Sequence, residues 1–271
     1  MHTNEMALRH EVVKIGQLMY EKGFILASDG NISVKLGNGR ILLTPSGLSK
    51  GLISPDELII VNEEGKKIAG PRHLNPTSEL PMHLEAYKQR PDIQAVVHAH
   101  PPYAVALSIA GISMAECLLP EAVVFLGSIP TTAYATPSSE ENAQVVRDLI
   151  GHHDGLVLQR HGSLTVGDSP MQAFMRLESL ERNAYIGYLL ATLNVHNPMQ
   201  PDDVRKLLAI RQKMGLSRPT ETAEFCEQCG VCHEDGNHIP GLISPYQTNS
   251  PSTTEIREMV TKIVEETLGK T

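Results

Sequence analysis

The sequence lacks any apolar stretch approaching the roughly 18 residues that would suggest a membrane-spanning helix. It also lacks a surplus of positive charge, because 23 Lys and Arg stand against 31 Asp and Glu, giving a net charge of −8. This balance, without any basic cluster, argues against a nucleic-acid partner. The N-terminal segment alternates polar and apolar positions at helical spacing, unlike a signal peptide, so we expect a cytoplasmic protein.

Cysteine is scarce, and its four copies are unevenly spread, with Cys117 standing alone. The other three fall within seven residues near the C-terminus: Cys226, Cys229 and Cys232. This distribution is not that of a disulfide framework. The C-x2-C-x2-C spacing, with His233 or His238 nearby, fits a structural zinc ion or an iron–sulfur cluster whose fourth ligand is not evident. A tail of reduced thiols is the third possibility.

Turn residues organise the first part of the chain into hairpins. Residues 37–39 and 63–65 each carry glycine between two apolar runs, which predicts two β-hairpins. A helix is expected to begin near Thr77 or Ser78, and residues 128–135 are expected to form a strand. Hairpins followed by alternating strands and helices predict an α/β fold with a central mixed, largely antiparallel sheet and helices on both faces.

The composition changes after about residue 197. Prolines become frequent from Pro198 onward, with short helical patterns between them. With 271 residues and 41% hydrophobic residues, the chain suits one core domain and an appendage. We therefore predict a catalytic domain over residues 1–197 and a C-terminal extension over residues 198–271.

Histidines at the ends of apolar runs are the first sign of chemistry. In "VVHAHPPY", His98 and His100 are two residues apart and would point to the same side of a strand. His161 ends a second apolar run, and Glu79 begins a predicted helix. Three histidines and a carboxylate form a common site for zinc or a similar divalent metal, although three histidines can also be scattered in a fold. His83, four residues after Glu79, would orient the carboxylate or merely cover the helix.

Short motifs in a fixed order resemble the class II aldolase/adducin family. They are Gly30-Asn31, "LLTPSG", "TSE", "VVHAHP", "IPTTAYAT" and "QRHG", and the resemblance covers roughly residues 8–195. It implies the family fold, with His98, His100, His161 and Glu79 as the metal site. Because adducin-type members have lost these residues, their presence here implies an enzyme and disfavours a non-catalytic interaction module.

The resemblance also implies a phosphate site. The family's aldolases hold phosphate with a Gly-Asn element, a hydroxyl-Gly pair after the second strand and two hydroxyl residues before the acid. The corresponding residues here are Gly30, Asn31, Ser46, Gly47, Thr77 and Ser78. Hydroxyls, an amide and backbone N–H groups at a helix start form an anion cradle, although each residue singly is also an ordinary turn or capping residue.

The reaction implied is cleavage of a phosphorylated ketose to dihydroxyacetone phosphate and an aldehyde. Zinc, or alternatively manganese or cobalt, would stabilise the carbanion while Glu79 moves the proton. The resemblance further implies a homotetramer with active sites between subunits, and Tyr246 of a neighbouring chain is one candidate to complete the pocket.

One segment departs from the fuculose-type pattern. Those aldolases place a proton-donating tyrosine after the HAH helix, whereas "CLLPEAVVFLG" has none here and Glu121 is the nearest acid. Glu121 replaces that donor if an apolar setting raises its pKa, or else it is a structural carboxylate. Decarboxylation also creates a carbanion beside a metal, so a decarboxylase or an epimerase on the same platform stays an alternative.

Overall fold

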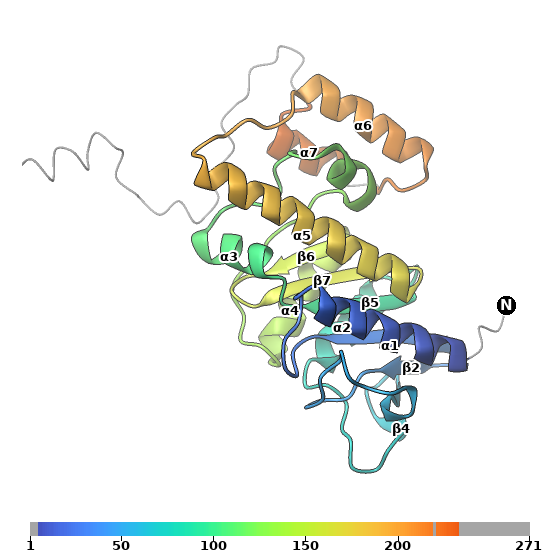
Figure 1. Cartoon of the computed structure of the whole chain (residues 1–271). Coiled ribbons are helices and arrows are strands. Elements are labelled where there is room, and N and C mark those ends of the chain that lie inside the picture. The colour runs from blue at the N-terminus through green and yellow to red at the C-terminus, as the bar shows by residue number, and fades with distance from the viewer. Residues whose placement is uncertain (1–4, 219–220, 233–271) are drawn as a thin grey trace, which may run out of the picture. The chain divides into compact units, whose positions relative to one another are not determined.

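A seven-stranded sheet forms the centre of the computed structural model, which describes residues 5–218 and 221–232 (Figure 1). The strands lie in the order β4-β3-β2-β1-β5-β7-β6. Their bounds are β1 (Asn31–Gly37), β2 (Arg40–Leu43), β3 (Ile59–Asn62), β4 (Lys67–Ala69), β5 (Ala95–Ala99), β6 (Gly155–Leu158) and β7 (Gly162–Gly167). All neighbouring strands run antiparallel. A parallel bridge joins Thr131 to Val157, so the predicted mixed, largely antiparallel sheet is confirmed.

Both early hairpins form at the predicted glycines. Asn38 and Gly39, between β1 and β2, have φ angles of 51° and 68°, as the tight turn matching strand twist requires. Gly65, between β3 and β4, has a φ of 80°. These turns fix the register of β1, and through it the position of the first polar residues of the site.

Helices cover both faces of the sheet (Figure 1). One face packs on α1 (Glu5–Glu21) and α5 (Pro170–Thr192), and the other on α2 (Leu80–Gln89) and α4 (Glu140–Ile150). Alternate strand residues supply the two cores, as the period of a strand dictates. In β5, for example, Val97 joins the first core and Val96 the second.

The helix α3 (Pro102–Ala110) begins immediately after the site strand β5. Pro102 suits its first turn because that position needs no N–H donor. The carboxylate of Glu181, on α5, accepts hydrogen bonds of 2.9 Å from the backbone N–H groups of Tyr103 and Ala104. An anchored helix start therefore fixes the chain directly after His100.

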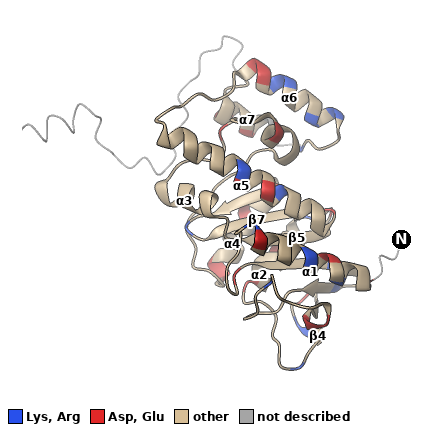
Figure 2. Cartoon of the chain, in the orientation of Figure 1, with Lys and Arg blue, Asp and Glu red and all other residues tan. Residues whose placement is uncertain are grey.

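The C-terminal helices α6 (Pro201–Lys213) and α7 (Glu221–Cys229) pack against the one-turn π-helix η2 (Ala122–Leu126). Acidic residues begin α6 and basic residues end it, as its macrodipole favours (Figure 2). A short 3-10 turn, η1 (Pro55–Glu57), precedes β3. The boundary at residue 197 stays a prediction, and His233, His238 and Tyr246 lie outside the described residues.

Two expectations from the sequence are wrong. Residues 128–135 form no strand, since apart from the bridge at Thr131 the segment is irregular, and Pro130 cannot donate to a ladder. The cysteines are paired, Cys117 with Cys229 and Cys226 with Cys232. The first pairing joins residues 112 positions apart, which composition alone does not reveal.

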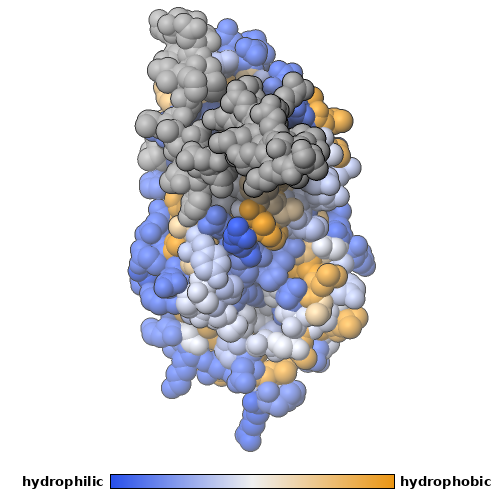
Figure 3. All heavy atoms as spheres, turned by 90° about the vertical axis from the view of Figure 1, so that its left-hand side faces the viewer, coloured by the Kyte–Doolittle hydropathy of each residue, from blue (hydrophilic) through white to orange (hydrophobic). Residues whose placement is uncertain are grey.

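No described helix is long and apolar enough to cross a membrane. On the face shown in Figure 3, hydrophobic side chains form separate spots among hydrophilic ones.

Candidate metal centre

The site is built where the end of β5 lies beside the start of β7. Antiparallel pairing places Ala99 opposite Ser163, so His100 and His161 follow and precede these strands at the same edge of the sheet. The close approach requires glycine after His161: a Cβ on Gly162 would lie 2.3 Å from the carbonyl oxygen of Ala99 and 2.8 Å from the His100 ring.

Four side chains converge there. Glu79 immediately precedes α2, on the face of the sheet to which the even-numbered residues of β5 point. Ligand atoms of Glu79, His98, His100 and His161 all lie within 4.8 Å of one another. The Nε2 atoms of His98 and His100 are 3.1 Å apart; the Glu79 carboxylate is 3.1 Å from His98 Nε2 and 3.0 Å from His161 Nε2.

The donor set fits a divalent metal. The Nδ1 atom of His98 lies 2.9 Å from the carbonyl oxygen of Ser163, so it carries the hydrogen and leaves the Nε2 lone pair directed at the cluster. For a metal–nitrogen bond of about 2.1 Å, a tetrahedral edge is about 3.4 Å, close to the separations observed. Glu79 Oε1 and His161 Nδ1 are buried atoms without a hydrogen-bond partner in the described chain. A cation would satisfy the former.

Charge in the cluster is concentrated on one carboxylate. Burial opposes ionisation of Glu79, but the adjacent imidazoles of His98 and His161 hold its pKa well below the usual range. Burial, reinforced by the His98 and His161 rings, lowers the pKa of His100 to about 3. At neutral pH the cluster thus offers an anionic oxygen ligand together with the uncharged imidazole of His100, the state in which imidazole binds metals.

A chain of buried polar side chains runs from Glu79 along the interface of β1 and α2. Asn31 Nδ2 donates to Glu79 Oε2 at 2.9 Å, and Asn31 Oδ1 lies 2.5 Å from His83 Nε2. His83 Nδ1 lies 2.7 Å from Ser33 Oγ, which is 2.8 Å from the hydroxyl of Tyr87. Asn31 and Ser33 share a strand face, while Glu79, His83 and Tyr87 recur every four residues, so the two sets interdigitate.

In this series of hydrogen bonds, each residue donates to the neighbour that is closer to Glu79. Because the amide of Asn31 donates to a carboxylate, its oxygen must accept from His83 Nε2–H. Burial lowers the pKa of His83 to about 3, so its other nitrogen carries no hydrogen and accepts from the hydroxyl of Ser33. The predicted orienting position of His83 thus exists in the structure, but its contact with Glu79 is through Asn31.

The predicted phosphate residues lie around the start of α2. A bridge between Pro45 and Pro76, and a 2.9 Å hydrogen bond from Ser46 N to Asn75 O, bring the Ser46-Gly47 turn beside Thr77 and Ser78. Gly47 has a φ of 77° and open space around a Cβ position. Thr77 is buried and accepts from the backbone N–H of Glu79, whereas Ser78 is exposed and accepts from Ser138 Oγ at 3.0 Å.

The Gly-Asn pair is placed differently. A Cβ on Gly30, which has a φ of 68°, would lie 2.9 Å from the His98 carbonyl oxygen, so Gly30 allows β1 to begin against β5. Asn31 already uses both ends of its side-chain amide on Glu79 and His83. Their role in phosphate binding stays a prediction.

Two further residues at the site escaped the sequence reasoning. Lys50 is buried, and desolvation lowers its pKa to about 8, although the charges of Asp29 and Glu79 oppose the shift. Its ammonium donates to the carbonyl oxygen of Ser28. The Asp29 carboxylate lies 3.6 Å from His100 Nδ1. The sequence signal that could have identified Lys50 is its position three residues after "LLTPSG", which contains predicted phosphate residues.

Glu121 is not brought to the cluster within one chain. It is exposed at the N-terminal end of η2, and no hydrogen bond or ion pair joins it to the four converging side chains among the described residues. Its predicted role as proton donor stays untested.

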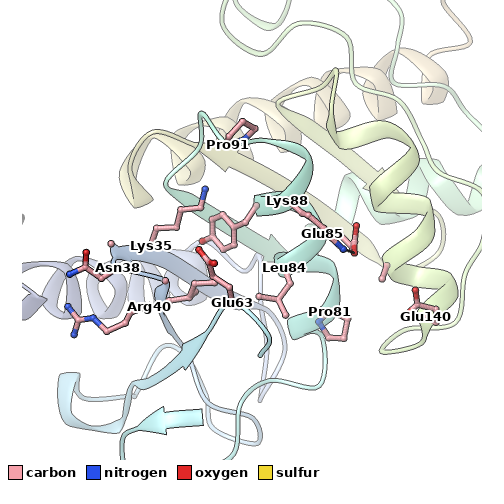
Figure 4. A pocket seen from close by; sticks show the side chains of 15 residues that line it. Lys35, Asn38, Arg40, Glu63, Pro81, Leu84, Glu85, Lys88, Pro91 and Glu140 are labelled. Carbon is pink, nitrogen blue, oxygen red and sulfur yellow. Dashed lines mark hydrogen bonds and ion pairs between the residues drawn. The ribbon is translucent and has the colours of Figure 1, made fainter. Parts of the chain in front are cut away.

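A pocket of about 720 Å³ lies elsewhere, between the β1–β2 hairpin and the helices α2 and α4 (Figure 4). Its wall carries Lys35, Arg40 and Lys88 along with Glu63 and Glu85. None of the four converging side chains lines it. The histidine cluster lies instead where β5 ends and β7 begins, and the His100 side chain there is 30% exposed.

Comparison with known proteins finds one family. A family model described as the class II aldolase and adducin N-terminal domain matches residues 10–188. The L-fuculose phosphate aldolase of Methanococcus vannielii is 34% identical over 184 residues, covering 68% of this chain and 97% of the relative. The 3-oxo-tetronate 4-phosphate decarboxylase of Escherichia coli K12 is 30% identical over 190 residues, covering 69% and 88%.

Solved structures give the same picture. YgbL from Klebsiella pneumoniae superposes with a TM-score of 0.71 at 29% identity, covering 76% of this chain and 99% of that one. The L-fuculose-1-phosphate aldolase from Thermus thermophilus superposes with a TM-score of 0.60 at 28% identity, covering 71% and 98%.

Proposed function

The chain belongs to the class II aldolase and adducin family, and we propose that it is a divalent-metal-dependent lyase that cleaves a phosphorylated ketose to dihydroxyacetone phosphate and an aldehyde. The observation that carries the proposal is the convergence of Glu79, His98, His100 and His161 within 4.8 Å. In this proposal the three histidines hold the metal, and Glu79 is both a ligand and the residue that moves the proton. Zinc suits this donor set, and manganese or cobalt also accept it.

The bound metal supplies Lewis acidity, which stabilises negative charge on the oxygen atoms of the substrate. The carbon–carbon bond breaks only if the carbanion left behind is stabilised and then protonated. Glu79 is placed to return that proton, because Asn31 holds one carboxylate oxygen and the other faces the cluster. Its low pKa in the metal-free cluster means that it enters the reaction as the carboxylate.

The phosphate group would bind at the start of α2. Ser46, Gly47, Thr77 and Ser78 lie next to one another there, and the backbone N–H groups of a helix start favour an anion. Lys50 adds a positive charge close enough to influence Glu79 and His100 electrostatically. Its pKa of about 8 keeps most of it protonated at neutral pH.

We also propose a cytoplasmic homotetramer with the active sites between subunits. His100 is partly exposed and Glu121 is exposed, which leaves the cluster open on one side and the predicted donor free to reach a neighbouring copy. The molar mass from light scattering tests the tetramer. A monomer would require the chain to complete its own pocket.

Decarboxylation of a phosphorylated 3-oxo acid is the second candidate. Two observations favour it: the decarboxylase relative at 30% identity, and the absence of a tyrosine in the segment around Glu121. Loss of carbon dioxide also leaves a carbanion next to a chelated carbonyl, so it would need the same metal but no donor toward an aldehyde oxygen.

One experiment separates the candidates. Metal content and product release are measured for the wild type, for His98→Ala and for His73→Ala, an exposed histidine outside the cluster as the matched control. A panel of ketose 1-phosphates is assayed for dihydroxyacetone phosphate, and phosphorylated 3-oxo acids for carbon dioxide. We expect loss of one metal equivalent and of dihydroxyacetone phosphate release only in His98→Ala. Carbon dioxide release instead would establish the decarboxylase, and no metal and no activity would point to a non-catalytic module.

A further inference from the structure

All four cysteines of the chain meet in one place, and none of them belongs to the histidine cluster. Cys226 and Cys229 are three residues apart on α7, so their side chains are neighbours on one helix face. Cys229 pairs with Cys117, with Cα atoms 6.0 Å apart, and Cys226 pairs with Cys232, with Cα atoms 5.0 Å apart. The two disulfides are therefore adjacent, and they gather four sulfur atoms from two segments of the chain.

Two of these cysteines are buried in an apolar cluster, whereas Cys226 is half-buried and Cys232 is exposed. Cys117 is 2% and Cys229 7% exposed, and Val123, Val204 and Phe225 from η2, α6 and α7 pack around them. The family match ends at residue 188, before three of the four cysteines. None of the four contributes to the proposed lyase chemistry, so they need an explanation of their own.

Metal chemistry explains both the spacing and the convergence. The C-x2-C-x2-C run supplies three closely spaced thiolates, and its fourth ligand, which the sequence does not reveal, is Cys117 in the fold. Four thiolates are the usual donor set for a closed structural zinc site and for iron–sulfur clusters. In a tetrahedral zinc site with bonds of about 2.3 Å, the sulfurs are about 3.8 Å apart, a change that side-chain rotation supplies when Cα atoms are 5–6 Å apart.

We propose that in the reduced protein Cys117, Cys226, Cys229 and Cys232 form a tetrathiolate metal centre that holds α7 against the segment leading into η2. The ligand is a thiophilic metal, either a zinc ion or an iron–sulfur cluster. The centre is independent of the histidine site and of the proposed lyase activity. Oxidised, the same sulfurs are the two disulfides of the structure, so the disulfide and metal-bound states exclude each other.

In the conversion between the two states, each disulfide takes two electrons from a reductant and two protons from water and yields two thiols. When the reductant is a phosphine, the oxygen of that water becomes the oxygen of the phosphine oxide. Metal binding then releases the thiol protons, because only the thiolate is a ligand.

The test uses the full chain purified without oxygen in a phosphine reductant. Zinc, iron and acid-labile sulfide are measured for the wild type, for Cys117→Ser and Cys232→Ser, and for His98→Ala, which keeps all four cysteines. We expect the cysteine variants to lose a metal complement that His98→Ala retains: about one zinc, or about four iron with sulfide. Zinc without sulfide identifies the ion, and iron with sulfide the cluster.

A second measurement needs no variant. Wild-type protein, stripped of metal, is titrated with Co²⁺ in its oxidised and reduced states, and thiolate-to-cobalt charge-transfer absorption is recorded. We expect this absorption only after reduction. Reduced wild type that binds no metal through its thiols would overturn the proposal. Full retention of the complement in Cys117→Ser, with loss in Cys232→Ser, would also overturn it, since the fourth ligand would then not be Cys117.

Discussion

Two buried polar clusters in this protein differ in the partners of their central carboxylate. Around Glu79, one buried carboxylate has only imidazoles as ion-pair partners in the described part of the chain. Around Asp154, a carboxylate that is 1% exposed lies 3.0 Å from Arg90 and 2.8 Å from Arg176 and pairs with Arg218 as well. The second cluster carries its own cations, the guanidinium groups, whereas the first has the donors for a cation and supplies none.

We expect the Asp154 cluster to contribute to stability and the Glu79 cluster to the chemistry of the site. The Asp154 cluster joins the end of α2, the long helix α5 and the segment before α7, so it ties the C-terminal helices to the sheet. The Glu79 cluster joins strand ends and a helix start at an open edge, where substrate can arrive. A substitution at Asp154 should destabilise the fold, and a substitution at Glu79 should abolish activity.

The largest expected effect is on turnover. Glu79→Gln keeps the shape of the side chain but removes proton transfer, so we expect kcat to fall by about 10²–10⁴-fold at saturating metal. Steady-state kinetics, with metal content measured on the same samples, separates this loss from a loss of metal. A variant that keeps wild-type kcat would show that Glu79 is only a ligand.

Asp154→Asn should act on stability instead. Removing the carboxylate leaves Arg176 without an ion-pair partner among the described residues, while Arg90 and Arg218 keep only Asp92, so the free energy of unfolding should fall by about 3–5 kcal/mol. Urea denaturation measures this change. Asp203, an exposed residue of α6, provides the control: little change is expected for Asp203→Asn. If Asp154→Asn lost activity while its folded fraction and stability stayed at the wild-type level, Asp154 would act on catalysis and not on stability.

Local rules were enough to predict part of this molecule. Positive φ angles at Asn38 and Gly39 follow from a turn rule, and the convergence of His98 and His100 follows from the period of a strand. The partnership of Asn31 with Glu79, or of Cys117 with Cys229, depends on register and packing between segments far apart in the chain. No local pattern carries that information, which is why the hydrogen-bond chain and the fourth cysteine emerged only from the fold.

The hydrogen-bond chain offers a graded test of how Glu79 is held. His83→Phe removes both ring nitrogens and should lower metal affinity or kcat by about 10–100-fold, the usual cost of losing a residue that orients a ligand. Ser33→Ala should cost less, and Tyr87→Phe, at the far end, least.

A merely structural role would not produce that order. His83→Gln, which restores a donor and an acceptor on one side chain, should recover part of the loss, and metal titration with kinetics on all four variants measures it. Equal effects along the chain, or no rescue by glutamine, would mean that these residues only fill the interface of β1 and α2.

The smallest expected effect concerns the docking of α7 and its dependence on pH. His153 Nε2 lies 2.8 Å from the Glu224 carboxylate; burial opposes protonation of His153, but this hydrogen bond raises its pKa above the ordinary value. A raised histidine pKa contributes stability that is complete below about pH 6.5 and is lost as pH rises through the folded value. Glu224→Gln should therefore lower the free energy of unfolding by about 1 kcal/mol at about pH 5.5 and by much less at about pH 9. Denaturation at both pH values, each against wild type, measures the difference, and a deficit that grows with pH would reverse the assigned role of this pair.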